Sequence, residues 1–64
     1  MTIEEVLNIY KTAYQVCKVL DISRQNFTIW KKQGYIPYRQ QLKIEILTEG
    51  KLKADLEMYL KQKH

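Results

Sequence analysis

Residues 12–32 read TAYQVCKVLDISRQNFTIWKK, and this stretch decides the fold. Its apolar residues form two short segments with the spacing of an amphipathic helix. Between the segments stands Asp21, a residue type that tolerates the left-handed backbone of a tight turn. Ser23 follows at the position of a helix N-cap. The pattern predicts a helix that begins after Thr12, a turn at Asp21, and a second helix over residues 24–32.

Five residues in this stretch meet, in register, the requirements of a helix-turn-helix motif. Cys17 supplies a small apolar side chain where the two helices cross closely. Asp21 follows four residues later in the turn, and Ile22 fills the gap between the helices. Ser23 caps the second helix, and Phe27 occupies a buried position four residues further on. In proteins with this motif the second helix enters the major groove, so the spacing favours DNA binding.

The outward side of the second helix contains the candidates for reading DNA bases. Phe27 and Trp30, three residues apart, are expected to be buried, which turns the opposite side toward solvent. Arg24 can pair bidentately with guanine, and Gln25 can do so with adenine. The predicted base contacts are Arg24, Gln25, Thr28 and Ile29, of which the last two would touch a thymine methyl group.

Phosphate contacts are predicted on both sides of this helix. Thr12 caps the first helix of the motif, whose N-terminal backbone can receive a phosphate oxygen. The complete set of candidates is Thr12, Lys31, Lys32, Tyr35, Tyr38 and Arg39. Two alternatives remain open: Arg39 can form an ion pair with Glu45, and the two lysines can be solvated surface residues.

The other segments also have helical spacing. Thr2 can cap a helix that ends near Tyr10 or Lys11, and Pro37 suits the first turn of a helix that Gly50 would end. The expected inward-facing residues are Ile3, Val6, Leu7 and Tyr10; Val16, Val19 and Leu20; and Leu42, Ile46 and Leu47. The tail, residues 51–64, shows the spacing of a further helix. We therefore predict a single all-α domain over residues 1–64, with four or five helices including the helix-turn-helix.

The charge distribution agrees with a nucleic-acid partner. The chain has 64 residues, with 11 Lys or Arg against 7 Asp or Glu, and a net charge of +4. Residues 18–43 contain six of the basic residues and a single acid, Asp21. Positive charge on and after the motif suits binding to DNA phosphates. A chain of this length forms one small domain without room for a deep substrate cleft.

The composition excludes several other classes of protein. One cysteine cannot form an intramolecular disulfide, and the sequence has no metal-ligand pattern, nucleophile–base pair or phosphate loop. We therefore expect no enzyme activity, no cofactor and no metal. The sequence shows neither an 18-residue apolar run nor a signal-peptide pattern, so we expect a cytoplasmic protein, associated with the bacterial nucleoid and not with a membrane.

Two blocks of the sequence resemble a known family. Residues 16–32 (VCKVLDISRQNFTIWKK) and 36–53 (IPYRQQLKIEILTEGKLK) resemble the Cro/CI-type repressors of phages, and most closely the short Cro-like, YdaS-like proteins. The second block matches their "IP…R…IE…T.G.L" segment. The resemblance implies an α-helical core, binding to an operator as a dimer, and transcriptional repression. Cys17 and Asp21 depart from the Ala and Gly that the family usually has.

A dimer is expected because one such domain contacts too little DNA for strong specificity. The half-sites of a palindromic operator would then lie about 34 Å apart. The predicted dimer contacts, in the tail, are Leu52, Leu56 and Tyr59. The tail can instead fold back on the core, and residues 47–52 are another candidate for the interface. Nothing in the sequence suggests a pocket for a small-molecule effector.

Two other functions are compatible with the sequence. Residues 23–37, SRQNFTIWKKQGYIP, also resemble the opening of excisionase-like and MerR-like winged proteins, which bend DNA and would place a strand after Pro37. The helical spacing from Pro37 to Gly50 argues against such a wing. The domain can also be an antitoxin-like protein-interaction module, although the basic residues between positions 18 and 43 favour DNA.

Overall fold

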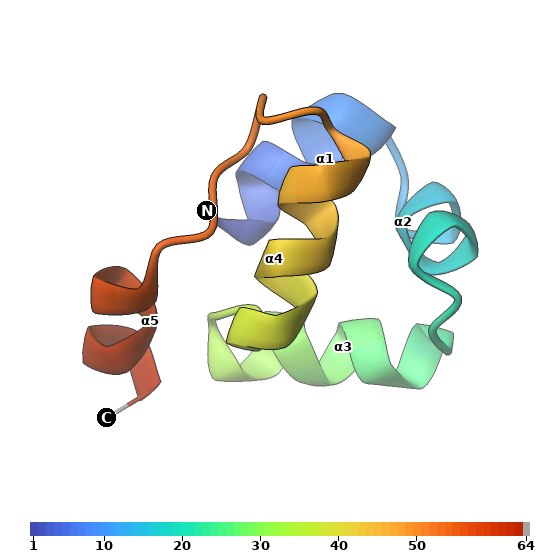
Figure 1. The fold of residues 1–64 in the computed structure, drawn as a ribbon. Coiled ribbons are helices and arrows are strands. Elements are labelled where there is room, and N and C mark those ends of the chain that lie inside the picture. Colours follow the sequence, from blue (N-terminus) through green and yellow to red (C-terminus); the bar gives the residue numbers. More distant parts are fainter. Residues whose placement is uncertain (64) are drawn as a thin grey trace.

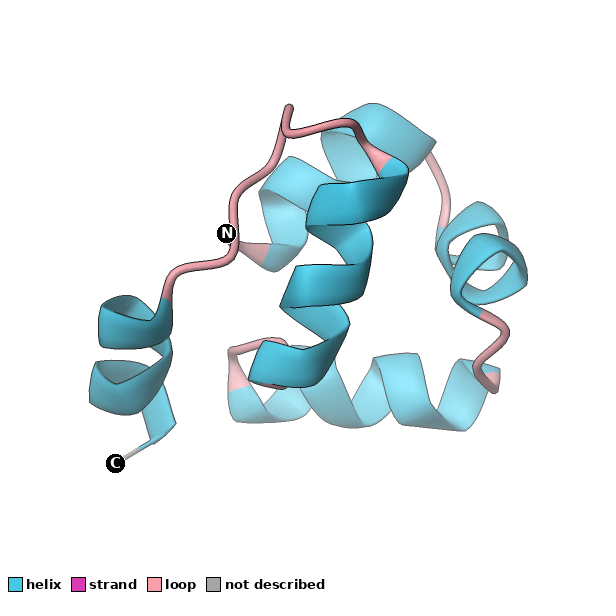
Figure 2. Cartoon of the chain, in the orientation of Figure 1, coloured by secondary structure: helices cyan, strands magenta, loops and turns pink. Residues whose placement is uncertain are grey.

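The computed structural model describes residues 1–63, which form five helices and no strand (Figures 1 and 2). The helices are α1 (Ile3–Tyr10), α2 (Ala13–Leu20), α3 (Arg24–Gln33), α4 (Tyr38–Leu47) and α5 (Leu56–Lys63). The predicted all-α class is confirmed. The winged alternative is wrong, since a helix and not a strand follows Pro37. His64, the last residue of the predicted tail, lies outside the described residues.

The predicted caps start the first three helices. At α1, the Thr2 hydroxyl accepts a hydrogen bond from the Glu5 N–H at 3.1 Å, and the Glu5 carboxylate accepts one from the Thr2 N–H at 2.7 Å. Thr12 and Ser23 each accept from the backbone N–H three residues on, at 3.2 and 3.1 Å. Each cap satisfies an N–H group that the helix itself leaves unpaired, and each contributes about 1 kcal/mol.

The helices of the motif end on left-handed residues, as their sequence predicts. Asp21 has φ 55° and ψ 50° after α2, and Gly34 has φ 86° and ψ 9° after α3. The end of α4 differs from the prediction by a few residues. The helix stops at Leu47, and Gly50 closes the following turn by donating from its N–H to the Glu45 carbonyl at 2.9 Å.

The core lies where α1, α2, α3 and α4 meet. Figure 1 shows α3 along one edge of the domain and α4 running from the end of α3 toward α1. Phe27 and Trp30 are buried as predicted, with ring centroids 5.9 Å apart and an interplanar angle of 64°. The other buried apolar residues are Met1, Val6, Val16, Cys17, Leu20, Ile36, Ile44 and Leu52.

The apolar stripe predicted for α4 is wrong. Leu42, Ile46 and Leu47 were expected to face inward but are 43%, 77% and 45% exposed. Gln41, Ile44 and Thr48 occupy the buried side instead. Val19 of α2 was also expected to be buried and is 38% exposed.

Hydrogen bonds explain why two polar residues occupy the buried side of α4. The Gln41 side chain donates to the Ile36 carbonyl at 2.8 Å and accepts from the Asp55 N–H at 3.2 Å. The Thr48 hydroxyl donates to the Ile44 carbonyl at 2.8 Å and accepts from the Leu52 N–H at 3.2 Å. Burying a polar group costs little once its hydrogen bonds are made, so these side chains can tie the segment after α4 to the core.

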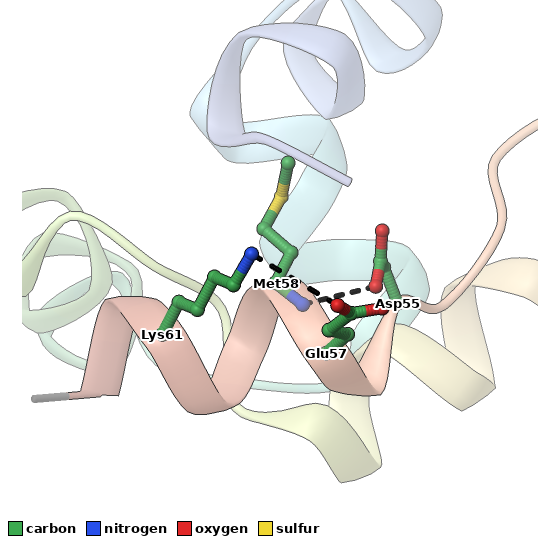
Figure 3. A network of polar contacts seen from close by, with 4 residues as sticks. All are labelled: Asp55, Glu57, Met58 and Lys61. Carbon is green, nitrogen blue, oxygen red and sulfur yellow. Dashed lines mark hydrogen bonds and ion pairs between the residues drawn. The ribbon is translucent and has the colours of Figure 1, made fainter.

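The last helix forms from its own local contacts. The Asp55 carboxylate accepts a hydrogen bond from the Met58 N–H at 3.0 Å and so caps α5, while Lys61 pairs with Glu57 at 3.9 Å (Figure 3). This ion pair is largely exposed and adds little stability. Helix α5 contributes no buried residue to the core. In Figure 1 it lies on the side of the domain where α3 ends and α4 begins.

Candidate nucleic-acid interface

The exposed side of α3 contains the four residues predicted to read bases. Arg24, Gln25, Thr28 and Ile29 are all exposed, and Ile29 keeps half of its surface open to solvent, at 50%. Phe27 and Trp30 hold the opposite side of the helix in the core. The sequence therefore predicted correctly which side of α3 faces outward.

One of these residues already uses its polar group. The Thr28 hydroxyl donates a hydrogen bond to the Arg24 carbonyl at 2.9 Å, one turn earlier in the helix. Thr28 is exposed as a residue and its hydroxyl is already used, so it is better suited to an apolar contact than to donating a hydrogen bond to a base.

The candidate phosphate contacts surround α3. Thr12 is exposed at the start of α2, where its hydroxyl caps the helix. Lys31 and Lys32 are exposed in the last turn of α3, and Arg39 is exposed in the first turn of α4.

Arg39 does not form the ion pair with Glu45 that the sequence left open. The Glu45 carboxylate accepts instead from the Ala54 N–H at 2.7 Å. Within residues 1–63 the one ion pair joins Lys61 and Glu57, at the far end of the chain. Arg24, Lys31, Lys32 and Arg39 therefore carry charges that no carboxylate of the described chain neutralises.

Lys43 has a structural role that the sequence did not reveal. Its ammonium donates to the Leu20 carbonyl at 3.0 Å and so caps the C-terminus of α2. A cation is favourable at this end of a helix because the unpaired carbonyls carry partial negative charge. The contact also fastens α4 to the end of α2, immediately before the turn of the motif.

Tyr35 and Tyr38 belong to an aromatic cluster. Tyr59 of α5 packs against both rings, with centroid distances of 5.6 Å to Tyr35 and 6.0 Å to Tyr38. The three residues come from the α3–α4 connection, from α4 and from α5. Because no regular spacing links them in the sequence, their contact was not predictable from periodicity.

The three predicted dimer residues have different environments. Leu52 is 8% exposed and belongs to the core of its own chain, which leaves it little surface for a second chain. Leu56 is 49% exposed. Tyr59 is partly buried within its own aromatic cluster. Of the three, only Leu56 presents a largely open apolar side chain.

Residues 1–63 contain no group of three or more His, Cys, Asp or Glu side chains that could hold a metal ion. Among the same residues, no helix has the length and apolar character needed to cross a membrane.

This geometry defines a class of protein. Two short helices are joined by a left-handed turn, and the second exposes polar and basic residues beside cations that have no carboxylate partner within residues 1–63. This arrangement is that of a helix-turn-helix DNA-binding domain. A family model described as DNA-binding transcriptional regulator Cro, of the P22 Cro type, matches residues 2–64. The chain belongs to this family, as its resemblance to Cro-type proteins implied.

The family membership settles the broad function. The protein is a Cro-type DNA-binding transcriptional regulator and not an enzyme. The family therefore does not support the alternative of a protein-interaction module without DNA binding. Comparisons with curated proteins and with solved structures give no match.

Proposed function

We propose that this regulator is a repressor that binds a palindromic operator as a dimer, with one α3 helix in the major groove of each half-site. The observation that carries the proposal is the division of α3 into two sides. Phe27 and Trp30 fix one side in the core, while Arg24 and Gln25 stand exposed in the first turn. The N-terminal part of a recognition helix is the part that contacts base edges.

Each side chain on this surface has a distinct role in the proposal. Arg24 pairs with guanine and Gln25 with adenine, and each bidentate pair provides about 1–3 kcal/mol of discrimination. The Thr28 methyl group and the Ile29 side chain contact thymine methyl groups. Sequence is read by these four residues, while the surrounding cations fix the position of the domain on the duplex.

The phosphate contacts are divided between the two ends of the motif. On one side, the N-terminus of α2 with its Thr12 cap approaches a phosphate oxygen. On the other side, Lys31, Lys32 and Arg39 bind the backbone that flanks the groove. Their free charge supports this role, because no carboxylate of the described residues neutralises them. Tyr35 and Tyr38 contribute through their hydroxyl groups, since their rings pack on Tyr59.

Dimerisation is proposed through the open side of α5. Leu56 and Leu60 stand four residues apart and therefore on the same side of the helix, and they are 49% and 47% exposed. Tyr59 takes part by holding α5 against its own domain, and Leu52 takes no part. Repression is steric, by occupation of a promoter, and needs no small-molecule effector.

The double substitution Arg24→Ala with Gln25→Ala tests the docking of α3. We expect it to abolish preference for the operator over unrelated duplexes while leaving helicity unchanged, because both side chains are exposed. Titration of labelled duplexes, with circular dichroism as the folding control, measures both properties. Lys51→Gln is the control, because Lys51 borders a surface hollow whose other lining residues, such as Ile9 and Tyr10, all lie outside α3. Retained operator preference in a folded double variant would contradict the proposal.

A further inference from the structure

The middle of α5 packs against the corner between α3 and α4. Tyr59 meets the Tyr35 ring edge-on, at 5.6 Å and an interplanar angle of 74°, and lies against the Tyr38 ring at 6.0 Å. The Lys63 ammonium lies over the Tyr59 ring, 5.8 Å from its centroid. Lys63 is thus joined through one aromatic ring to two residues of the α3–α4 corner.

A second link fixes the start of the same helix. The buried Gln41 side chain accepts from the Asp55 N–H at 3.2 Å and donates to the Ile36 carbonyl at 2.8 Å. Asp55 in turn caps α5 through the Met58 N–H. Helix α5 is therefore linked just before its start to Gln41 of α4, and in its middle to Tyr35 and Tyr38 at the corner between α3 and α4.

The two lysines of α5 that follow Tyr59 are in different situations. Lys61 is paired with Glu57, and the two charges neutralise one another (Figure 3). Lys63 has no carboxylate partner among residues 1–63 and is held over an aromatic ring, a favourable place for a cation. Figure 1 shows the C-terminal end of α5 at the edge of the domain along which α3 lies.

We propose that Lys63 contacts the DNA backbone. The Tyr35–Tyr38–Tyr59 cluster positions it beside the DNA strand that flanks the major groove in which α3 docks. This inference rests on the proposed function, since it requires α3 to dock in the major groove. The ammonium binds a phosphate oxygen without reading sequence. Tyr59 acts as a positioning residue, because its ring holds α5 on the corner and lies beneath the cation.

The salt dependence of DNA binding tests the proposal. Each phosphate neutralised adds about 0.9 to the slope of log Kd against log salt concentration. Because each subunit of the proposed dimer supplies one Lys63, we expect Lys63→Gln to lower that slope by about 1.8 on every duplex that the dimer binds, operator or not, and to leave the preference for the operator unchanged. Between about 50 mM and about 200 mM salt, the wild-type protein would then lose about twelvefold more affinity than the variant.

Two matched pairs of variants make the result specific. Lys51→Gln removes the same charge at the surface hollow whose lining residues all lie outside α3, and is expected to keep the wild-type slope. Tyr59→Leu removes the ring beneath Lys63 and is expected to lower the slope as Lys63→Gln does. Tyr59→Phe keeps the ring and is expected to keep the wild-type slope. Circular dichroism establishes that the other helices remain formed in each variant. Sedimentation establishes that each variant still self-associates as the wild-type protein does, because Tyr59 also holds the proposed dimer contact of α5.

The outcomes separate this inference from the proposed function. If the wild-type protein prefers an operator but Lys63→Gln keeps the full slope, Lys63 is not a backbone contact and the docking of α3 still stands. If Lys51→Gln and Lys63→Gln lower the slope equally, the effect is general charge and the inference is wrong. If the wild-type protein shows no preference among duplexes, the proposed function fails and the inference fails with it.

Discussion

Gln40 and Gln41 are neighbours on α4 with opposite hydrogen-bonding situations. Gln41 is 1% exposed, and both ends of its amide are used, one by the Ile36 carbonyl and one by the Asp55 N–H. The Gln40 side-chain oxygen is also buried, yet it has no hydrogen-bond partner within residues 1–63. Only Gln41 connects separate parts of the chain, so the two residues should differ sharply in their contribution to stability.

We predict that Gln41→Leu lowers the free energy of unfolding by about 1–3 kcal/mol, because it leaves a buried carbonyl and a partly buried N–H unsatisfied. Gln40→Leu should leave it unchanged or raise it slightly, because the substitution removes a buried oxygen that has no partner. Urea unfolding followed by circular dichroism measures both values. Equal losses in the two variants would contradict the assigned role of Gln41.

At the scale of elements, the helix-turn-helix was predictable because each of its devices is local. Thr12 and Ser23 cap helices through the backbone three residues away, and Asp21 turns the chain by its own φ of 55°. The buried side of α4 was not predictable from periodicity. Gln41 and Thr48 face inward because they form hydrogen bonds with backbone groups 14 and 4 residues further along the chain. The spacing of apolar residues does not reveal such partners.

The candidate site could also be predicted only in part from the sequence. The outward side of α3 follows from the spacing of Phe27 and Trp30, so the exposure of Arg24 and Gln25 could be predicted. The packing of Tyr59 on Tyr35 and Tyr38 could not, because it depends on how α5 returns to the corner between α3 and α4.

The turn of the motif gives a prediction of its own. Asp21 adopts a left-handed conformation, which strains any residue with a Cβ atom and costs glycine nothing. Asp21→Gly should therefore raise the free energy of unfolding by up to about 1 kcal/mol. The DNA affinity of the folded protein should not change. Asp21→Ala keeps the Cβ atom and should give no gain. Thermal unfolding of both variants checks this, and a loss of stability in Asp21→Gly would show that the aspartate side chain outweighs the strain.

At the scale of the whole molecule, two leucines of the tail have separate roles. Leu52 lies in the core at 8% exposure, whereas Leu56 is 49% exposed on α5. Leu52→Ala should lower the free energy of unfolding by about 2–5 kcal/mol, as is usual for a buried leucine. Leu56→Asp should leave it nearly unchanged but weaken self-association, because it places a charge in the proposed interface. Sedimentation in the presence of operator DNA measures self-association, and urea unfolding measures the free energy of unfolding. Unchanged self-association in Leu56→Asp would exclude α5 as the dimer contact.

The central claim is that two copies of this domain read a palindrome through α3, and selection of bound duplexes from a random pool tests it most directly. Selection at about 150 mM salt suppresses non-specific phosphate binding. The account predicts an enriched palindrome whose half-site centres lie about 34 Å apart, one turn of B-DNA. Absence of enrichment from a folded protein, or an enriched site without two-fold symmetry, would contradict it.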